Sequence, residues 1–159
     1  MSWIQQEQSI VTDATPEFKE QLQQAFRALD VGQTLTFRRT FNDGDVALFC
    51  GVTGDYNPYH LDDTFAAQSW YGRRIVPGLL TASMLTHIGG LLGFLATDMS
   101  FEYLAAVYLG DTITCTVTIS EKSDDERLMA GTAMYVNQAG VEVLRARFRG
   151  FPAQVRLAR

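Results

Sequence analysis

The longest apolar stretch of the chain runs from Ile75 to Ala96, and it is interrupted by His87, a Gly89-Gly90 pair and several hydroxyl side chains. A membrane-spanning helix needs about 20 predominantly apolar residues with fewer such interruptions. A helix that is apolar on every side in a globular chain is instead a buried helix. We therefore expect a long central helix over about residues 78–95, surrounded by the rest of the chain.

The residues before this stretch alternate between helical and extended patterns. An outer helix is predicted over residues 15–29, because Thr15 is a suitable cap, Pro16 fits the first position, and apolar residues recur at helical spacing. Residues 34–41 are typical of a strand. We expect a short helix after Asn42, an ordered loop over residues 51–60, and a further short helix through Trp70.

The residues after the apolar stretch follow the pattern of strands. Residues 100–108 lead to a Gly110-Asp111 turn, and residues 112–119 alternate threonine with apolar side chains. Residues 128–136 and 141–149 form a predicted hairpin, which a solvated turn over residues 121–126 precedes. About five strands and one long helix predict an α+β fold, with an antiparallel sheet curled around the helix. Such a sheet leaves an open edge, so we expect a two-fold symmetric dimer.

Length and composition fit one globular domain spanning residues 1–159. The 159 residues are 47% hydrophobic and 19% charged, which excludes a disordered or fibrous chain. The net charge of −5 disfavours binding to nucleic acid. Cys50 and Cys115 each lie alone in an apolar segment, as reduced core thiols of a cytoplasmic protein do. The first residues have neither the basic start nor the apolar core of a signal peptide.

Candidate chemistry is concentrated in the loop 51–60, which places Asp55, Asn57 and His60 within six residues. Pro58 restricts the conformation of the loop. A carboxylate and an imidazole on a rigid turn can converge on one water molecule and carry out general acid–base catalysis. The same residues also suit a turn in which Asp55 and Asn57 only accept hydrogen bonds from the local backbone. The residue types alone leave both interpretations open.

A second candidate is the start of the apolar helix at Pro77-Gly78. The first turn of a helix has backbone N–H groups without helical partners and a positive dipole end, which suit a polarised carbonyl oxygen. Gly78 has no side chain to hinder the approach of a ligand. Pro-Gly is also a common way to begin a helix, without any functional role.

These segments form one longer pattern along the chain. It consists of Thr53-Gly54-Asp55-Tyr56-Asn57-Pro58-Tyr59-His60, Asp62, Ala66, Tyr71-Gly72, Arg74-Ile75-Val76-Pro77-Gly78, Ala82-Ser83 and Gly110-Asp111. The pattern resembles the motif of (R)-specific enoyl-CoA hydratases, which belong to the MaoC-like dehydratases of the hot-dog superfamily. The resemblance covers a core of about residues 34–150, and the helix at 15–29 lies outside the motif region.

The resemblance implies a hot-dog fold, a homodimer and roles for five residues. Asp55 and His60 would be the catalytic pair that holds the reactive water. Asn57 would help to orient the loop or the pair, as one of the substrate-binding residues. The Gly78 N–H would bind the thioester carbonyl, and Ser83 would line the substrate pocket near the pair. Pro77 stands where the family often has histidine, and proline is a frequent variant at that position.

The activity implied is that of a lyase of fatty acid metabolism, which adds water reversibly to a 2-trans-enoyl-CoA and gives the (R)-3-hydroxyacyl-CoA. No metal or cofactor is expected, because coenzyme A or a carrier protein enters as part of the substrate. Three alternatives remain: a 3-hydroxyacyl thioester dehydratase acting on carrier-protein-bound chains, a non-catalytic acyl-thioester-binding subunit, and a thioesterase. Hot-dog thioesterases lack the Asp–Asn-Pro–His string, which disfavours the last. Neither a membrane nor a nucleic acid is an expected partner.

Charged residues outside the loop have two possible roles. His87 either lines the acyl pocket or dimer interface, or it is a hydrogen-bonded core histidine. Arg145, Arg147 and Arg149 alternate along one predicted strand and project from one face. This stripe, or the pair Arg73-Arg74, suits the phosphates of coenzyme A, but a solvated outer face is the favoured role for most of these arginines.

Overall fold

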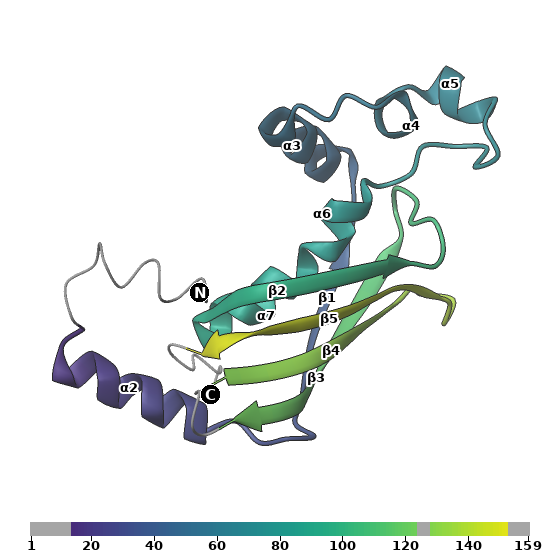
Figure 1. The fold of residues 1–159 in the computed structure, drawn as a ribbon. Coiled ribbons are helices and arrows are strands. Elements are labelled where there is room, and N and C mark those ends of the chain that lie inside the picture. The colour runs from purple at the N-terminus through teal and green to yellow at the C-terminus, as the bar shows by residue number, and fades with distance from the viewer. Residues whose placement is uncertain (1–13, 124–127, 153–159) are drawn as a thin grey trace.

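A computed structural model describes residues 14–123 and 128–152 of the chain, and its centre is one antiparallel sheet of five strands (Figure 1). The strand order across the sheet is β1-β3-β4-β5-β2, so that β1 and β2 are the two edges. The strands are β1 (Thr34–Thr40), β2 (Phe94–Tyr103), β3 (Thr112–Ser123), β4 (Leu128–Val136) and β5 (Glu142–Pro152). The predicted α+β fold with five strands is confirmed.

The helices lie in three places around the sheet. They are α2 (Pro16–Arg27), α3 (Asp43–Thr53), α4 (Pro58–Leu61), α5 (Asp63–Ala67), α6 (Gly78–Ala82) and α7 (Met84–Leu92). Helices α6 and α7 pack against the sheet, and α2 lies near one end of it (Figure 1). Residues 42–75, which carry α3, α4 and α5, project beyond the other end, and we call them the overhang. None of the helices among the described residues combines the length and apolar character needed to cross a membrane.

The central helix is shorter and more exposed than the sequence predicts. Helix α6 ends at Ala82, α7 begins at Met84, and Gly93 ends α7 in the left-handed conformation (φ 55°). Residues 94–95, predicted as helix, instead begin the edge strand β2. Only one face of α7 is buried against the sheet, and its other face is open in the single chain. Thr86, His87 and Gly90, which interrupt the apolar stretch in sequence, lie on this exposed face. The prediction of a helix that is apolar on every side did not take account of them.

Four inward-facing side chains of β3 form the middle of the core. Ile113, Cys115, Val117 and Ile119 are all 1% exposed or less, as the alternation with threonine predicts. Tyr135 of β4 is buried among them, and its hydroxyl donates a hydrogen bond of 2.9 Å to the carbonyl of Ala82. Burial raises the pKa of the Cys115 thiol to about 11 and also raises the pKa of the Tyr135 phenol. Both groups are therefore neutral near pH 7, and Tyr135 ties the junction of α6 and α7 to the sheet.

Several predicted boundaries need correction. Residues 51–60 are mostly helical, because α3 continues to Thr53 and α4 begins at Pro58. Helix α5 ends at Ala67 and does not reach Trp70. In the predicted turn over 121–126, residues 121–123 belong to β3, and the remainder lies outside the described residues. These differences arise because side-chain caps and a left-handed Gly54 (φ 74°) define the helices, and neither produces a hydrophobic period.

Gly150 allows the edge strand β2 to lie directly against β5. A Cβ atom at this position would be 2.1 Å from the carbonyl oxygen of Leu95 and 2.8 Å from the Cα of Ala96. We predict that Gly150→Ala lowers the free energy of unfolding by about 3 kcal/mol, because backbone atoms have to move. Gly51→Ala is the control: its Cβ meets nothing within 4 Å, and helix propensity favours alanine by about 0.5–1 kcal/mol. Urea unfolding measures both, and equal stabilities of the two variants would contradict the prediction.

Candidate active site

Local hydrogen bonds fix the loop between α3 and α4. The Asn57 side chain caps α4, accepting from the N–H of Tyr59 at 3.2 Å, and Pro58 occupies the first helical position. Asp55 Oδ1 accepts from the N–H of Asn57 at 3.2 Å, and the N–H of Asp55 donates to Thr53 Oγ1. The local turn that the sequence suggested is therefore present. It occupies only one oxygen of the Asp55 carboxylate.

The other carboxylate oxygen of Asp55 faces His60. Asp55 Oδ2 lies 3.8 Å from His60 Nε2, and His60 Nδ1 lies 2.8 Å from the carbonyl oxygen of Ile75. A carbonyl oxygen can only accept, so Nδ1 carries the proton and the neutral ring keeps its lone pair at Nε2. His60 is buried, whereas the Asp55 side chain is 44% exposed. The two groups form an accessible pair that is too far apart for a direct hydrogen bond.

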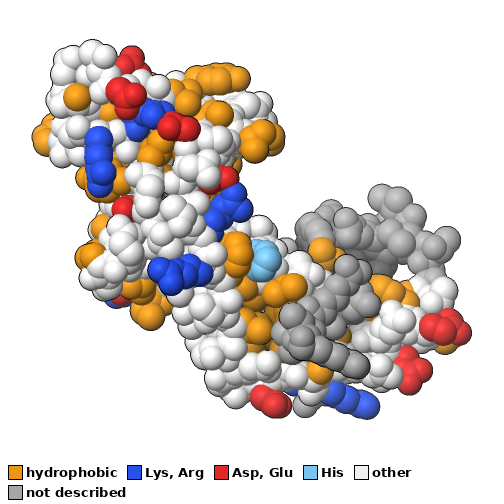
Figure 2. Space-filling view, turned by 180° about the vertical axis from the view of Figure 1, so that it is seen from behind, with side chains coloured by type: hydrophobic (Ala, Val, Ile, Leu, Met, Phe, Trp, Pro, Cys, Tyr) orange, Lys and Arg blue, Asp and Glu red, His pale blue; other side chains and the backbone are white. Residues whose placement is uncertain are grey.

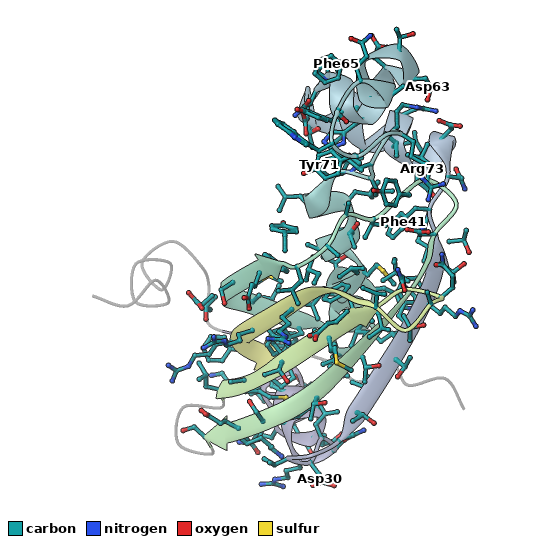
Figure 3. The ribbon with its side chains drawn as sticks, turned by 90° about the vertical axis from the view of Figure 1, so that its right-hand side faces the viewer. Asp30, Phe41, Asp63, Phe65, Tyr71 and Arg73 are labelled. Carbon is teal, nitrogen blue, oxygen red and sulfur yellow. The ribbon has the colours of Figure 1, made fainter. Side chains whose placement is uncertain are left out.

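Arg74 holds the helices of the overhang together. Its guanidinium donates to Asp63 at 2.7 Å and to Asp43 at 2.7 Å, so that it joins α5 to α3. The hydrogen bond to Asp63, followed by that to Asp43, raises the pKa of Arg74 against a smaller opposing effect of burial. Arg73 instead lies over the ring of Tyr108, 4.2 Å from its centroid. Figure 3 shows Arg73, Tyr71, Asp63 and Phe65 in the part of the molecule that extends beyond the sheet.

A cavity of about 380 Å³ lies beside His60, between the overhang, α6 and the ends of β2 and β5. Gly78 and Thr81 of α6 line it together with His60. Its remaining walls are mainly apolar: Tyr71, Ile75, Val76, Tyr103, Leu104, Ala105, Ala106, Val107, Val143 and Leu144. The Tyr103 ring packs against Gly78, where an added Cβ would lie 2.7 Å from Tyr103 Cε1. The arrangement is a mostly apolar pocket that His60 lines, whereas Asp55 is not among the lining residues and lies beside His60.

Ser83 is not among the residues that line this cavity, in contrast to the expected pocket position near Asp55 and His60. It lies at the junction of α6 and α7, and its hydroxyl donates to the carbonyl of Leu80 at 2.6 Å. Ser83 lines a separate groove of about 510 Å³ between α3 and α7, which His87 also lines. The bend between α6 and α7 turns Ser83 to the exposed side.

His87 is not the hydrogen-bonded core histidine that was one of its two predicted roles. It is exposed, and its ring stacks on Phe37 with centroids 3.8 Å apart. The predicted arginine stripe does project from one face of β5, opposite to the buried Ala146 and Phe148. Arg145 pairs with Glu142 at 2.5 Å. The stripe lies on the sheet face away from the helices, so it does not reach the cavity beside His60.

The sequence patterns did not identify Thr81 or Tyr103 as specific parts of the site. Thr81 stands out weakly in the sequence as a polar residue in a predicted apolar helix, whereas nothing in the sequence pattern marks Tyr103 as a cavity residue. The patterns suggested the phosphates of coenzyme A as a partner of Arg74, and in the structure Arg74 instead binds Asp63 and Asp43. In the part of the chain that the structure describes, no three His, Cys, Asp or Glu side chains group so that they could hold a metal ion.

Comparison with known proteins identifies the class of fold and then the family. The structure resembles that of an (R)-hydratase from Aeromonas caviae involved in PHA biosynthesis, with a TM-score of 0.76 at 28% identity over 79% of this chain and 98% of the other. An R-hydratase from Pseudomonas aeruginosa also has a TM-score of 0.76, at 25% identity over 84% and 91% of the two chains. The fold is therefore the hot-dog fold.

The family model of the MaoC like domain matches residues 26–141, and the chain belongs to this family. The (R)-specific enoyl-CoA hydratase of Aeromonas caviae is 32% identical over 123 residues, which are 72% of this chain and 88% of the relative. The 3-hydroxybutyryl-CoA dehydratase of Methylorubrum extorquens is 32% identical over 64% of this chain and 68% of the relative. A mitochondrial 3-hydroxyacyl-[acyl-carrier-protein] dehydratase of Arabidopsis thaliana is 32% identical, over 54% of this chain and 52% of its own length.

Proposed function

We propose that the chain catalyses the reversible, (R)-specific hydration of 2-trans-enoyl-CoA to (R)-3-hydroxyacyl-CoA. The observation that carries this proposal is the spacing of Asp55 and His60, of which His60 lines an apolar cavity. Asp55 Oδ2 and His60 Nε2 are both hydrogen-bond acceptors when the ring is neutral, and they lie 3.8 Å apart. A contact of this length suits a bridging water molecule, which can donate one hydrogen bond to each group.

The proposed reaction follows from the chemistry of such a water molecule. With both of its hydrogens engaged, the water directs its oxygen lone pairs to C3 of the enoyl chain. The pair takes one proton as the C3–O bond forms and returns one proton to C2, so that it ends the cycle in its starting protonation state. Both additions take place on the face of the chain that meets the pair, which is a syn addition. The chemistry uses only the acyl thioester, water and the two side chains.

Negative charge develops on the thioester oxygen during the attack on C3. Gly78 lines the same cavity as His60, and its N–H lies in the first turn of α6, where helical acceptors are lacking. We assign the Gly78 N–H to this oxygen. Pro77 has no N–H to offer, and the five residues of α6 provide only a short helix. Asn57 acts through the loop, because its side chain caps α4 and so orients His60.

The relatives favour hydration of a CoA thioester over the alternatives. Those with the longer alignments are named (R)-specific enoyl-CoA hydratase and 3-hydroxybutyryl-CoA dehydratase. Dehydration of a carrier-protein-bound chain is the second candidate, supported by relatives of which this chain spans about half. A purely acyl-binding role would leave the paired Asp55 and His60 without a use. Buried free thiols at Cys50 and Cys115 support the expected location in the reducing cytoplasm.

Hydration of crotonyl-CoA, followed by loss of absorbance of the conjugated double bond and chiral analysis of the product, tests the function. We expect the (R)-3-hydroxy product from the wild type. Asp55→Asn and His60→Gln should each lower kcat by at least about 10²-fold, because each replaces a group that can take up and release a proton with an amide that cannot. The double variant should be little worse than the worse single variant, because the two side chains act as a unit.

Asp62→Asn serves as the matched control for these variants. Asp62 caps α5 by accepting from the N–H of Phe65 at 2.9 Å, and an asparagine keeps that cap. Its kcat should remain within a factor of about two of wild type. Near-normal turnover in either Asp55→Asn or His60→Gln, with the fold intact, would refute the assigned pair.

Gly78→Val tests the carbonyl site. The valine side chain fills the space beside the Gly78 N–H, so kcat/KM should fall by the equivalent of about 3–4 kcal/mol, as for loss of an oxyanion donor. The melting temperature should fall much less, because the half-exposed Tyr103 ring can turn outward and valine costs less than about 1 kcal/mol in a first helical turn. Tyr103→Ala shows what loss of the ring alone does. Lost stability with activity per folded molecule retained would assign Gly78 a structural role instead.

The surface of the single chain favours the expected homodimer. The overhang exposes 95% of Trp70 and 88% of Val52, and Figure 2 shows hydrophobic side chains over this part of the surface. Edge strand β2 exposes Leu95, Met99 and Tyr103, whereas edge strand β1 exposes mainly threonine and arginine. Charged edges resist pairing and apolar edges invite it. We assign the interface to β2 and place the site near the subunit boundary, because Tyr103 also lines the cavity beside His60.

Light scattering at micromolar concentration should therefore give twice the chain mass of 17.7 kDa. Leu95→Lys should shift the protein toward the monomer with loss of activity, because it puts a charge on the exposed apolar edge. Met134→Lys is the matched control, since Met134 is an exposed apolar side chain on an interior strand. A fully active wild-type monomer would contradict the assembly.

A further inference from the structure

The hydroxyl of Thr81 is the one buried side-chain polar atom without a hydrogen-bond partner among residues 14–123 and 128–152. The residue is 1% exposed. Burying a hydroxyl without a partner costs free energy, and such groups are rare in folded proteins. An unpaired hydroxyl at a cavity wall is therefore evidence for a ligand atom that pairs with it.

No carbonyl group of the same helix accepts a hydrogen bond from the Thr81 hydroxyl. Helical hydroxyls often bond a carbonyl in the preceding turn, as Ser83 does with Leu80 and Thr86 does with Ser83, both at 2.6 Å. The corresponding carbonyl for Thr81, three residues back, belongs to Gly78, and the Thr81 hydroxyl makes no hydrogen bond to it. The Thr81 N–H donates to the carbonyl of Pro77 at 3.1 Å. The Thr81 hydroxyl takes no part in this local pattern.

Thr81 lies next to the residues to which the proposed reaction is assigned. Thr81 lines the cavity that His60 and Gly78 also line. It follows Gly78 by three residues, so both lie on the same side of α6. Most of the remaining wall is aliphatic or aromatic and provides few other side-chain donors.

We propose that Thr81 is a substrate-binding residue whose hydroxyl donates a hydrogen bond to the carbonyl oxygen of the bound acyl thioester. The inference rests on the proposed function, and it adds a side-chain donor to the Gly78 N–H at the same oxygen. A hydroxyl can rotate toward its acceptor, whereas a backbone N–H is fixed. The bond strengthens as charge develops on the oxygen, so the hydroxyl acts on kcat as well as on KM.

Two substitutions separate the hydroxyl from the shape of the side chain. Thr81→Val keeps the shape and removes the donor, and Thr81→Ser keeps the donor. With crotonyl-CoA, we expect kcat/KM to fall about tenfold or more in Thr81→Val and less than about threefold in Thr81→Ser. The melting temperature of Thr81→Val should be unchanged or higher, because an unpaired buried hydroxyl is lost. Thr132→Val, on the exposed outer face of β4, should change neither quantity.

Three results would overturn the inference while leaving the proposed function intact. The first is hydration by Thr81→Val within about twofold of wild type. The second is equal damage in Thr81→Ser and Thr81→Val, which indicates packing. The third is a lower melting temperature in Thr81→Val with normal activity per folded molecule, which indicates that the hydroxyl only holds a structural water molecule.

Calorimetric binding of butyryl-CoA, a saturated thioester that cannot be hydrated, tests the Thr81 hydrogen bond separately from the proposed function. If the wild type does not hydrate crotonyl-CoA, the proposed function is wrong. Weaker binding of butyryl-CoA by Thr81→Val than by wild type and Thr132→Val then still supports the donor. Equal binding by all three proteins, or no binding by the wild type, overturns it.

Discussion

The hydrogen bond between His60 Nδ1 and the carbonyl of Ile75 is the contact on which the site depends. It joins the short helix α4 to the segment that returns from the overhang to the sheet. It also sets the protonated nitrogen of the ring, so that Nε2 faces Asp55 with a lone pair. The neighbouring backbone bond from Ile75 N–H to the carbonyl of Tyr59, at 3.0 Å, keeps the two segments in register. The His60 side chain is therefore oriented by main-chain groups, which do not change with the sequence.

Patterns of hydrophobicity predicted the sheet well. The alternation in β3 and the hairpin of β4 and β5 were visible because each strand buries one face and exposes the other. The Asp–Asn-Pro–His string predicted a rigid turn, and the cap at Asn57 and the hydrogen bond from the Asn57 N–H to Asp55 make it one. Local sequence specifies these features, so no tertiary information was needed to find them.

The central helix and the surroundings of Ser83 were not predictable in the same way. The break between α6 and α7 lies beside a contact with β4, where the Tyr135 hydroxyl donates to the carbonyl of Ala82. Such a contact between distant segments has no local signal in the sequence. Thr81 and Ser83 are two residues apart and have similar hydroxyls, yet one is buried and the other exposed. Residues two apart on a helix project to nearly opposite sides, so only one of the two can face the sheet. The rotation of the helix about its axis decides which one does, and in an apolar stretch the sequence pattern does not specify that rotation.

The strand order has a consequence for how the chain is made. Strand β2 pairs only with β5, although β3 and β4 lie between them in sequence. On the ribosome, β2 and the helices before it emerge well before β5, because nearly 40 residues separate the end of β2 from the start of β5. During synthesis β2 thus remains without its intramolecular partner until the final strand appears. The nascent chain is most open to wrong pairing in that interval, and chaperone protection is most useful then.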